Sequence, residues 1–236
     1  HERETWTYSE NEDVLTITQK TRPFSLWFNL KFASSDKLTM YIQIPKSMEG
    51  QLSLETNVGD IIIDASETVV LKDVVFKSNT GSITLKNLIV DNLVAETDTG
   101  RIILTSISSA EAIDVETSTG RIDLEDLISN DLKASTSTGS VILKSSQING
   151  QVDLKTSTGS IELRLTTATG YKLKTSTGSI NMYFSSLSEL KYDLETSTGE
   201  IQVNNVGQGN KHTTTNGSIL IKASTNTGSI RIYVQA

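Results

Sequence analysis

Apolar side chains alternate with polar ones along most of the chain, and regularly spaced glycines interrupt the alternation. Near-copies of the segment Val152–Leu163 recur roughly every twenty residues, each with its glycine at the same place. The anchors are Gly59, Gly81, Gly100, Gly120, Gly139, Gly159, Gly178, Gly199, Gly217 and Gly228. A fixed period with a strand pattern inside it is typical of stacked repeats, so the sequence predicts a repeat architecture.

Each copy holds four apolar positions, two before its glycine and two after it. Around Gly159 these positions are Val152, Leu154, Ile161 and Leu163. Alternation at period two on both sides of the glycine predicts two short strands per copy, each with one buried face. A looser apolar position follows in most copies and predicts a third side, as at Leu88, Ile107, Leu127 and Ile148.

One copy offers too few inward side chains to bury a core alone, so the copies are expected to stack. The prediction is an all-β fold, a parallel β-helix or β-solenoid of about nine to ten rungs of ~20 residues each. At ~4.8 Å per rung the rod would be on the order of 45 Å long. A β-propeller would need about forty residues per blade. The short step from Gly217 to Gly228 predicts a shortened closing turn or hairpin.

The segment Thr-Ser-Thr-Gly is interpreted as a corner of the coil. Glycine tolerates the positive φ of a tight bend, and the residue two before it is a turn-former in every copy. Parity places Thr156 and Thr158, with their equivalents, on the inward side, which predicts two internal columns of hydroxyl groups. If both columns instead lay exposed on a flat strand, the array would fit an ice-binding solenoid.

Residues 1–50 lack the repeat and hold both tryptophans and three of the five phenylalanines. Their alternation predicts strands over Thr5–Ser9, Asp13–Thr18, Phe24–Phe32 and residues 38–44. The open end of a stacked array exposes apolar surface and unpaired backbone, which something must cover. We therefore interpret residues 1–50 as an N-terminal β-strand cap and residues 51–236 as one continuous solenoid domain. A ligand groove lined by the aromatic cluster is the alternative.

Composition removes several classes of function. The net charge is −7 without a Lys/Arg cluster, so we expect no nucleic-acid partner. No apolar run approaches the ~18 residues of a membrane span. The chain contains no cysteine, which excludes disulfides, thiol nucleophiles and cysteine metal sites. Because the sequence begins at His1, a leader, anchor or tag is expected to have been removed.

Candidate chemistry is sparse. The histidines are the terminal His1 and His212, the latter in a polar run interpreted as a solvated loop. Glycan-cleaving β-helices use outward carboxylates, and parity places three outward: Asp123, Asp153 and Glu162. No aspartate recurs at the corner as calcium-binding repeats require. Asn216 begins a glycosylation sequon that also fits a simple Asn-Gly corner. We therefore predict no catalytic residue, metal or cofactor, and no enzymatic activity.

Three stretches carry a resemblance to a known family. Tyr41–Lys46, then Leu52–Ile61, then the repeated Thr-x-Thr-Gly-x-Ile-x-Leu rungs resemble a prokaryotic adhesin-like domain family of unknown function. The resemblance covers about residues 38–236. It implies a β-helical fold and an envelope-associated or exported setting, with no catalytic residues to transfer.

The sequence thus predicts a non-catalytic, extracellular or cell-surface β-solenoid module, acting as an adhesin-like binding domain or a structural scaffold. The alternatives are a glycan-active enzyme on a β-helix scaffold and an ice-binding solenoid. Expected partners are a cell-surface glycan or an envelope protein, with end-to-end self-association if the C-terminal end of the stack is open.

Overall fold

The computed structural model describes residues 6–11, 14–19 and 50–235, and all regular structure in these residues is β-strand. The predicted strands Phe24–Phe32 and 38–44 lie outside the described residues. The strands are β1 (Trp6–Asn11), β2 (Val14–Gln19), β3 (Gln51–Val58), β4 (Ile61–Val70), β5 (Asp73–Thr80), β6 (Ile83–Thr99), β7 (Ile102–Thr119), β8 (Ile122–Ser129), β9 (Asp131–Thr138), β10 (Val141–Lys144), β11 (Gln147–Ile148), β12 (Gln151–Thr158), β13 (Ile161–Arg164), β14 (Gly170–Thr177), β15 (Ile180–Phe184), β16 (Leu190–Thr198), β17 (Ile201–Val203), β18 (Val206–Gly207), β19 (Lys211–Thr213), β20 (Ile219–Thr227) and β21 (Ile230–Val234).

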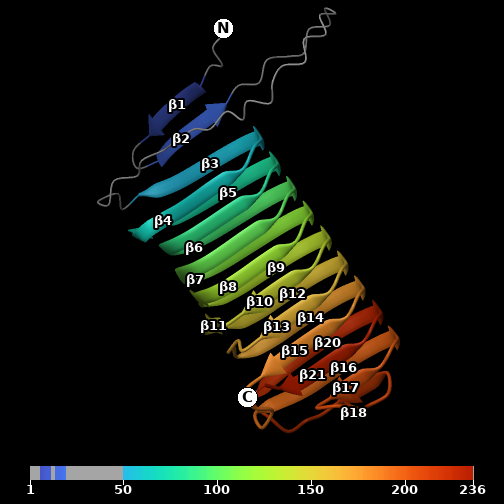
Figure 1. Cartoon of the computed structure of the whole chain (residues 1–236). Helices are drawn as coiled ribbons and strands as arrows, with labels where there is room; N and C mark the ends of the chain where they lie inside the picture. Colours follow the sequence, from blue (N-terminus) through green and yellow to red (C-terminus); the bar gives the residue numbers. More distant parts are fainter. Residues whose placement is uncertain (1–5, 12–13, 20–49, 236) are drawn as a thin grey trace, which may run out of the picture.

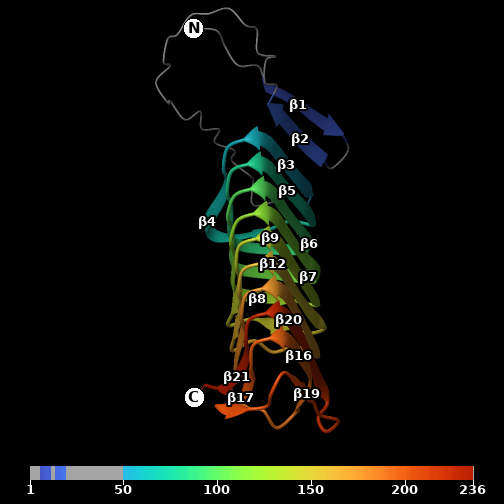
Figure 2. The same cartoon turned by 90° about the vertical axis from the view of Figure 1, so that its right-hand side faces the viewer.

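Figure 1 shows these strands stacked as the rungs of a parallel β-solenoid, and Figure 2 shows the same stack from its side. The side that precedes the glycines pairs β3 with β5, then the second halves of β6 and β7, then β9, β12 and β14, all parallel. The side that follows the glycines pairs β4, β6, β7, β8, β10, β13 and β15 in the same way. The predicted fold is confirmed.

The four predicted apolar columns form the core. Val152, Leu154, Ile161 and Leu163 are all fully buried, and their equivalents in neighbouring rungs lie directly above and below. The predicted third side is also present, because Leu88, Ile107 and Leu127 are buried and in register with one another. A stack of identical apolar residues thus buries continuously what no single rung could bury.

Variation in repeat length is absorbed on the third side. The longest early step, from Gly59 to Gly81, contains a register shift between Asp64 and Val69 of β4. A smaller shift lies between Val90 and Asn92 of β6. Inserted residues therefore bulge at these corners and leave the two long sides in register.

The glycine corners bring successive backbones unusually close together. A Cβ atom on Gly139 would lie 1.9 Å from the carbonyl oxygen of Gly120. Gly139 also has a φ of +144°, which L-residues rarely adopt. From the sequence, the glycine was expected only because the bend requires a positive φ. The structure adds the stronger reason, since any side chain would collide with the backbone of the previous rung.

The threonine prediction is half wrong. The threonine three before the glycine is buried in seven rungs, as at Thr117, which is 1% exposed and was predicted inward. The threonine directly before the glycine is exposed, as at Thr119, although parity had placed it inward as well. The strand alternation already ends at the bend, so the last threonine turns outward. The two-column exposed array of the ice-binding alternative is therefore not formed, because each pair presents one threonine to solvent.

The buried threonines are held by one repeated hydrogen bond. Each hydroxyl donates to the carbonyl oxygen of the glycine in the neighbouring rung, over 2.8 to 3.1 Å. The donors are Thr97, Thr117, Thr136, Thr156, Thr175, Thr196 and Thr225. The inward hydroxyl columns were expected to bond to one another along the axis, and this expectation is wrong, because each hydroxyl bonds to the glycine column instead.

The order of the last rungs departs from the order of the sequence. β20 pairs in parallel with β14 on one edge and with β16 on the other. β21 likewise lies between β15 and β17. In Figure 1 the red strands β20 and β21 accordingly lie between orange ones. The C-terminal segment therefore forms a complete rung inserted into the stack, and the rung of β16 and β17 lies at its end.

This insertion overturns the predicted closing turn. Gly228 is a true corner, because a Cβ on it would meet Gly178 while a Cβ on Gly199 would meet Gly228. Gly217 is not a corner, and its nearest neighbours belong to Glu189 and Leu190. Along the sequence, the corner glycines from Gly59 to Gly199 bound about seven turns of the solenoid. The rung of Gly228, inserted between those of Gly178 and Gly199, is additional to these turns. The predicted nine to ten rungs are thus slightly too many.

Short strands lie against both ends of the stack. β1 and β2 form an antiparallel pair, and β2 pairs in parallel with β3 over Val14–Ile17. At the other end β19 pairs antiparallel with β16, and β18 pairs antiparallel with β17. These strands occupy part of the backbone edge of each terminal rung, where unpaired groups would otherwise attract another chain.

The glycine corners generate a first prediction. Gly139→Ala places a methyl group against the backbone of Gly120, whereas Gly59→Ala places it 3.6 Å from a threonine hydroxyl at the same φ of +144°. We expect Gly59→Ala to lower the free energy of unfolding by about 1–3 kcal/mol, from φ strain alone. Gly139→Ala should cost more than ~4 kcal/mol, because strain and collision combine. Urea denaturation measures both, and equal losses would contradict the collision.

The threonine columns generate a second prediction. Thr156→Val keeps the shape of a buried side chain but leaves the carbonyl of Gly139 without its 2.8 Å donor. We expect a loss of about 1–3 kcal/mol in unfolding free energy. Thr158→Val, two residues away in the same motif but exposed, should change it by less than ~0.5 kcal/mol. Similar losses in both variants would show that the hydrogen bond is not what stabilises the corner.

Candidate binding surface

Outward side chains of the side that follows the glycines form one continuous column near the C-terminal end. Lys144 of β10, Arg164 of β13, Tyr183 of β15 and Tyr233 of β21 are aligned partners in successive rungs. All four are half-buried, so their outer parts reach solvent. We call these four residues the Tyr–Arg column.

The column is held by stacking. The rings of Tyr183 and Tyr233 are stacked, with centroids 5.3 Å apart and planes inclined by 24°. The guanidinium of Arg164 lies over the Tyr183 ring, 4.2 Å from its centroid, in a cation–π contact. Glu162 accepts a 2.5 Å hydrogen bond from Arg164 and thereby raises the pKa of that guanidinium further. The result is a rigid outward ridge of two aromatic rings and a cation.

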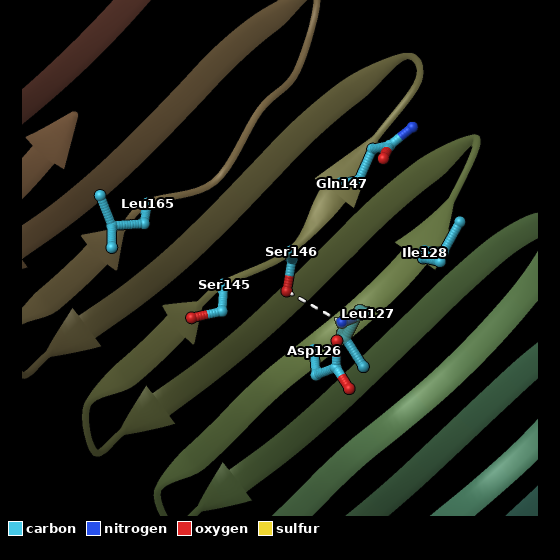
Figure 3. Close-up of a pocket in the computed structure, with 7 residues that line it drawn as sticks. All are labelled: Asp126, Leu127, Ile128, Ser145, Ser146, Gln147 and Leu165. Atoms are coloured by element: carbon cyan, nitrogen blue, oxygen red, sulfur yellow. Dashed lines mark hydrogen bonds between the residues drawn. The ribbon is translucent and has the colours of Figure 1, made fainter. Parts of the chain in front are cut away.

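A shallow groove of about 440 Å³ runs beside this ridge, at the corner between the second and third sides. Figure 3 shows its walls. The lining residues are Asp126, Leu127, Ile128, Ser145, Ser146, Gln147 and Leu165. Leu165 directly follows Arg164, so the groove and the Tyr–Arg column adjoin each other.

The floor of the groove is polar and fixed. The Ser146 hydroxyl accepts a 3.1 Å hydrogen bond from the backbone N–H of Leu127, drawn in Figure 3, and donates over 2.7 Å to the carbonyl of Lys144. Ser146 replaces the apolar residue of this inward column, so the wall is thinner there. Ile128 and Leu165 remain 48% and 45% exposed, which gives the groove an apolar rim.

The groove follows a second corner that sequence analysis missed. In five successive rungs the residue six after the glycine has a left-handed φ of 45° to 58°: Asn87, Ser106, Asp126, Ser145 and Leu165. Asparagine, aspartate and serine are turn-formers, and their spacing could have revealed this corner. Leu165 is the exception. A large apolar side chain held exposed in a left-handed conformation costs stability, and such strain clusters at functional sites.

The sequence did not predict the Tyr–Arg column, because rungs were expected to stack in chain order. In that order Tyr183 would align with Asn204, and Tyr233 would have no aromatic partner. The usable signal was position, since Tyr183 and Tyr233 both lie five residues after a glycine of the repeat. Only the insertion of the C-terminal rung brings them together.

The outward carboxylates considered for glycan cleavage do not converge. Asp123 accepts hydrogen bonds from Arg101 and Arg121 at 2.6 and 2.7 Å. Asp153 is engaged by Lys155 and Lys172 on the opposite side of the glycine corner. Asp123 and Glu162 share a column but are separated by the rung of Ile142. Each carboxylate thus serves an ion pair on the outer surface.

Neither His212 nor Asn216 lines the groove. His212 lies in β19 against β16, with its ring 5.8 Å from that of Tyr192, so it is not the solvated loop residue predicted. Asn216 is exposed in the segment that precedes β20. Among the described residues no three histidine or acidic side chains come together as a metal site. The described residues also include no helix long and apolar enough to cross a membrane.

Taken together, the fold and the surface define a three-sided parallel β-solenoid with a repeated interior and an exterior that varies away from the glycine corners. Residues 1–191 match the Toastrack DUF4097 family, which is more than half of the 236 residues. The chain therefore belongs to the Toastrack family of domains of unknown function. The match includes the first 37 residues, which the predicted resemblance left out. No curated protein and no solved structure matches the chain.

Tyr171, which packs edge-on against Phe184 beneath the ridge, generates a prediction on pH. It is 3% exposed, its hydroxyl donates to the Thr166 carbonyl over 2.6 Å, and burial raises its pKa from 10 to about 12. Above pH 10 the unfolded chain releases this proton first. The free energy of unfolding should therefore fall by about 2–3 kcal/mol between pH 10 and 12.

Tyr171→Phe removes the titrating group and supplies the comparison. Chemical denaturation at several pH values should show the two proteins parallel below pH 10, with the wild type falling more steeply above it. Equal slopes in both proteins would contradict the raised pKa of Tyr171.

Proposed function

We propose that this chain is a non-catalytic, adhesin-like binding module of the cell surface, and that its ligand is a cell-surface glycan. The observation that carries the proposal is the Tyr–Arg column beside the groove. Tyrosine and arginine are the residues most enriched where binding energy concentrates in protein interfaces. An aromatic ring offers a sugar an apolar face, while the groove and the cations beside it offer hydrogen bonds and charge.

The fold supports this proposal by separating two tasks. The inward residues repeat from rung to rung and specify the rod, whereas outward residues away from the glycine corners vary, as in the aligned series Lys144, Arg164 and Tyr183. A rod of this kind can carry an adaptable surface without loss of its core. The adhesin-like resemblance in the sequence and the expected export both fit a surface module. The family match supports neither an adhesin role nor a surface location, so both are part of the proposal.

Binding is tested by a glycan screen with the wild type and two column variants. Tyr183→Ala and Tyr233→Ala each remove one ring, and we expect each to weaken binding of a captured glycan by about tenfold or more. Thr158→Val, exposed at the other corner, is the matched control and should bind as the wild type does. Surface accessibility to an added protease in the native cell tests the proposed location.

The outcomes separate the alternatives. An absence of binding across neutral and acidic glycans, or binding that survives both tyrosine variants, would overturn the proposed site. Shortening of the captured glycan during incubation would identify the glycan-active enzyme instead. Retention of the protein inside the cell would overturn the surface location while leaving the binding result intact.

A further inference from the structure

The inserted C-terminal rung forms a distinct segment of the stack. We call residues 218–235, which contain β20 and β21, the insert, and the gap that they fill between β14/β15 and β16/β17 the slot. Both edges of the insert carry regular parallel pairing, so its residues complete two ladders at once. The insert is covalently connected to the rest of the stack only through residues 204–217.

The two walls of the slot carry matching inward residues. Tyr171 and Tyr192 both face Ile221, and Leu173 and Leu194 both face Ala223. Thr196 donates its hydroxyl to Gly228 of the insert, while Thr225 donates to Gly178 beyond it. If the insert left, Thr196 could donate to Gly178 instead. An empty slot can therefore close into a shorter stack with matched columns.

The segment that connects the insert to its slot is long, since it holds the fourteen residues 204–217 whereas only residues 165–169 separate β13 from β14. Residues 204–217 run back along the terminal rung, with Val206 opposite Val203 and His212 opposite Leu194. The segment thus spans nearly the length of one rung before the insert begins. It starts at Asn204 and Asn205, both left-handed with φ of 49° and 65°, which form the two-residue turn between β17 and β18 where the chain leaves the stack.

We propose that the insert exchanges between copies of this chain, so that the slot of one molecule is filled by residues 218–235 of a second. Reciprocal exchange preserves every contact of the insert, including the stack of Tyr233 on Tyr183, and alters only the connecting segment. Exchange of an identical element between copies is a low-cost route to a dimer. The proposal does not depend on the glycan ligand, although an exchanged dimer has a Tyr–Arg column built from two chains.

Single cysteines in separate chains test the exchange, because the chain has no cysteine of its own. Asn181 of β15 and Arg231 of β21 are outward partners in register. Neighbouring strands lie about 4.8 Å apart, within the Cα separation that a disulfide spans. Asn181→Cys and Arg231→Cys chains, mixed at high concentration or refolded together and then oxidised, should yield a disulfide-linked dimer on non-reducing gels.

Two controls make the result decisive. A chain with both substitutions should close its disulfide internally at low concentration, which checks the geometry. Lys155→Cys and Lys174→Cys in separate chains mark partners in β12 and β14, which no exchange of the insert can bring together, so they should stay unlinked. Dimers in that pair at the same yield, or none from Asn181→Cys with Arg231→Cys while the double variant closes, would overturn the proposal.

Discussion

The close stacking of glycine upon glycine is the contact on which the rest of the structure depends. At this corner the backbone of one rung lies where a Cβ atom of the next would have to be, and a threonine hydroxyl bonds the glycine carbonyl across the same gap. The corner therefore fixes the height and the register of each rung. Once it is fixed, the apolar columns on either side superimpose, because strand alternation carries the register outward from the corner.

The local sequence pattern predicted the features that the repeat controls. It did not predict which strands pair when those strands are distant in the sequence. The columns containing Val152 and Ile161 followed from alternation alone. The exposure of Thr158 did not, because parity counting continued through a bend where alternation had stopped. The position of β20 could not be derived either, since β16 offers β14 nearly the same inward residues. The Tyr–Arg column was lost with it, whereas the left-handed corner at Asp126 and Ser145 left a readable spacing of turn-formers.

The outer surface records a different constraint from the core. Inward residues must pack against the residues above and below them, so most inward columns repeat apolar side chains. An outward residue needs only water or an ion pair, as between Asp123 and Arg121, and can change without cost to the rod. The exposed apolar rim of the groove and the strained Leu165 cost stability that the fold does not require. Such a departure from local rules is expected where a surface serves a ligand rather than the core.

The inserted rung also bears on how the chain is made. On a ribosome, β16 and β17 emerge before β20 and β21, and at the usual rate of synthesis the intervening residues 204–218 take about 1–3 s. Strand pairing needs only microseconds. The edge of β14 is therefore free to β16 long before its final partner exists, and the nascent chain passes through a stack with one rung missing. Completion of the fold then requires that a formed pairing open to admit the last segment.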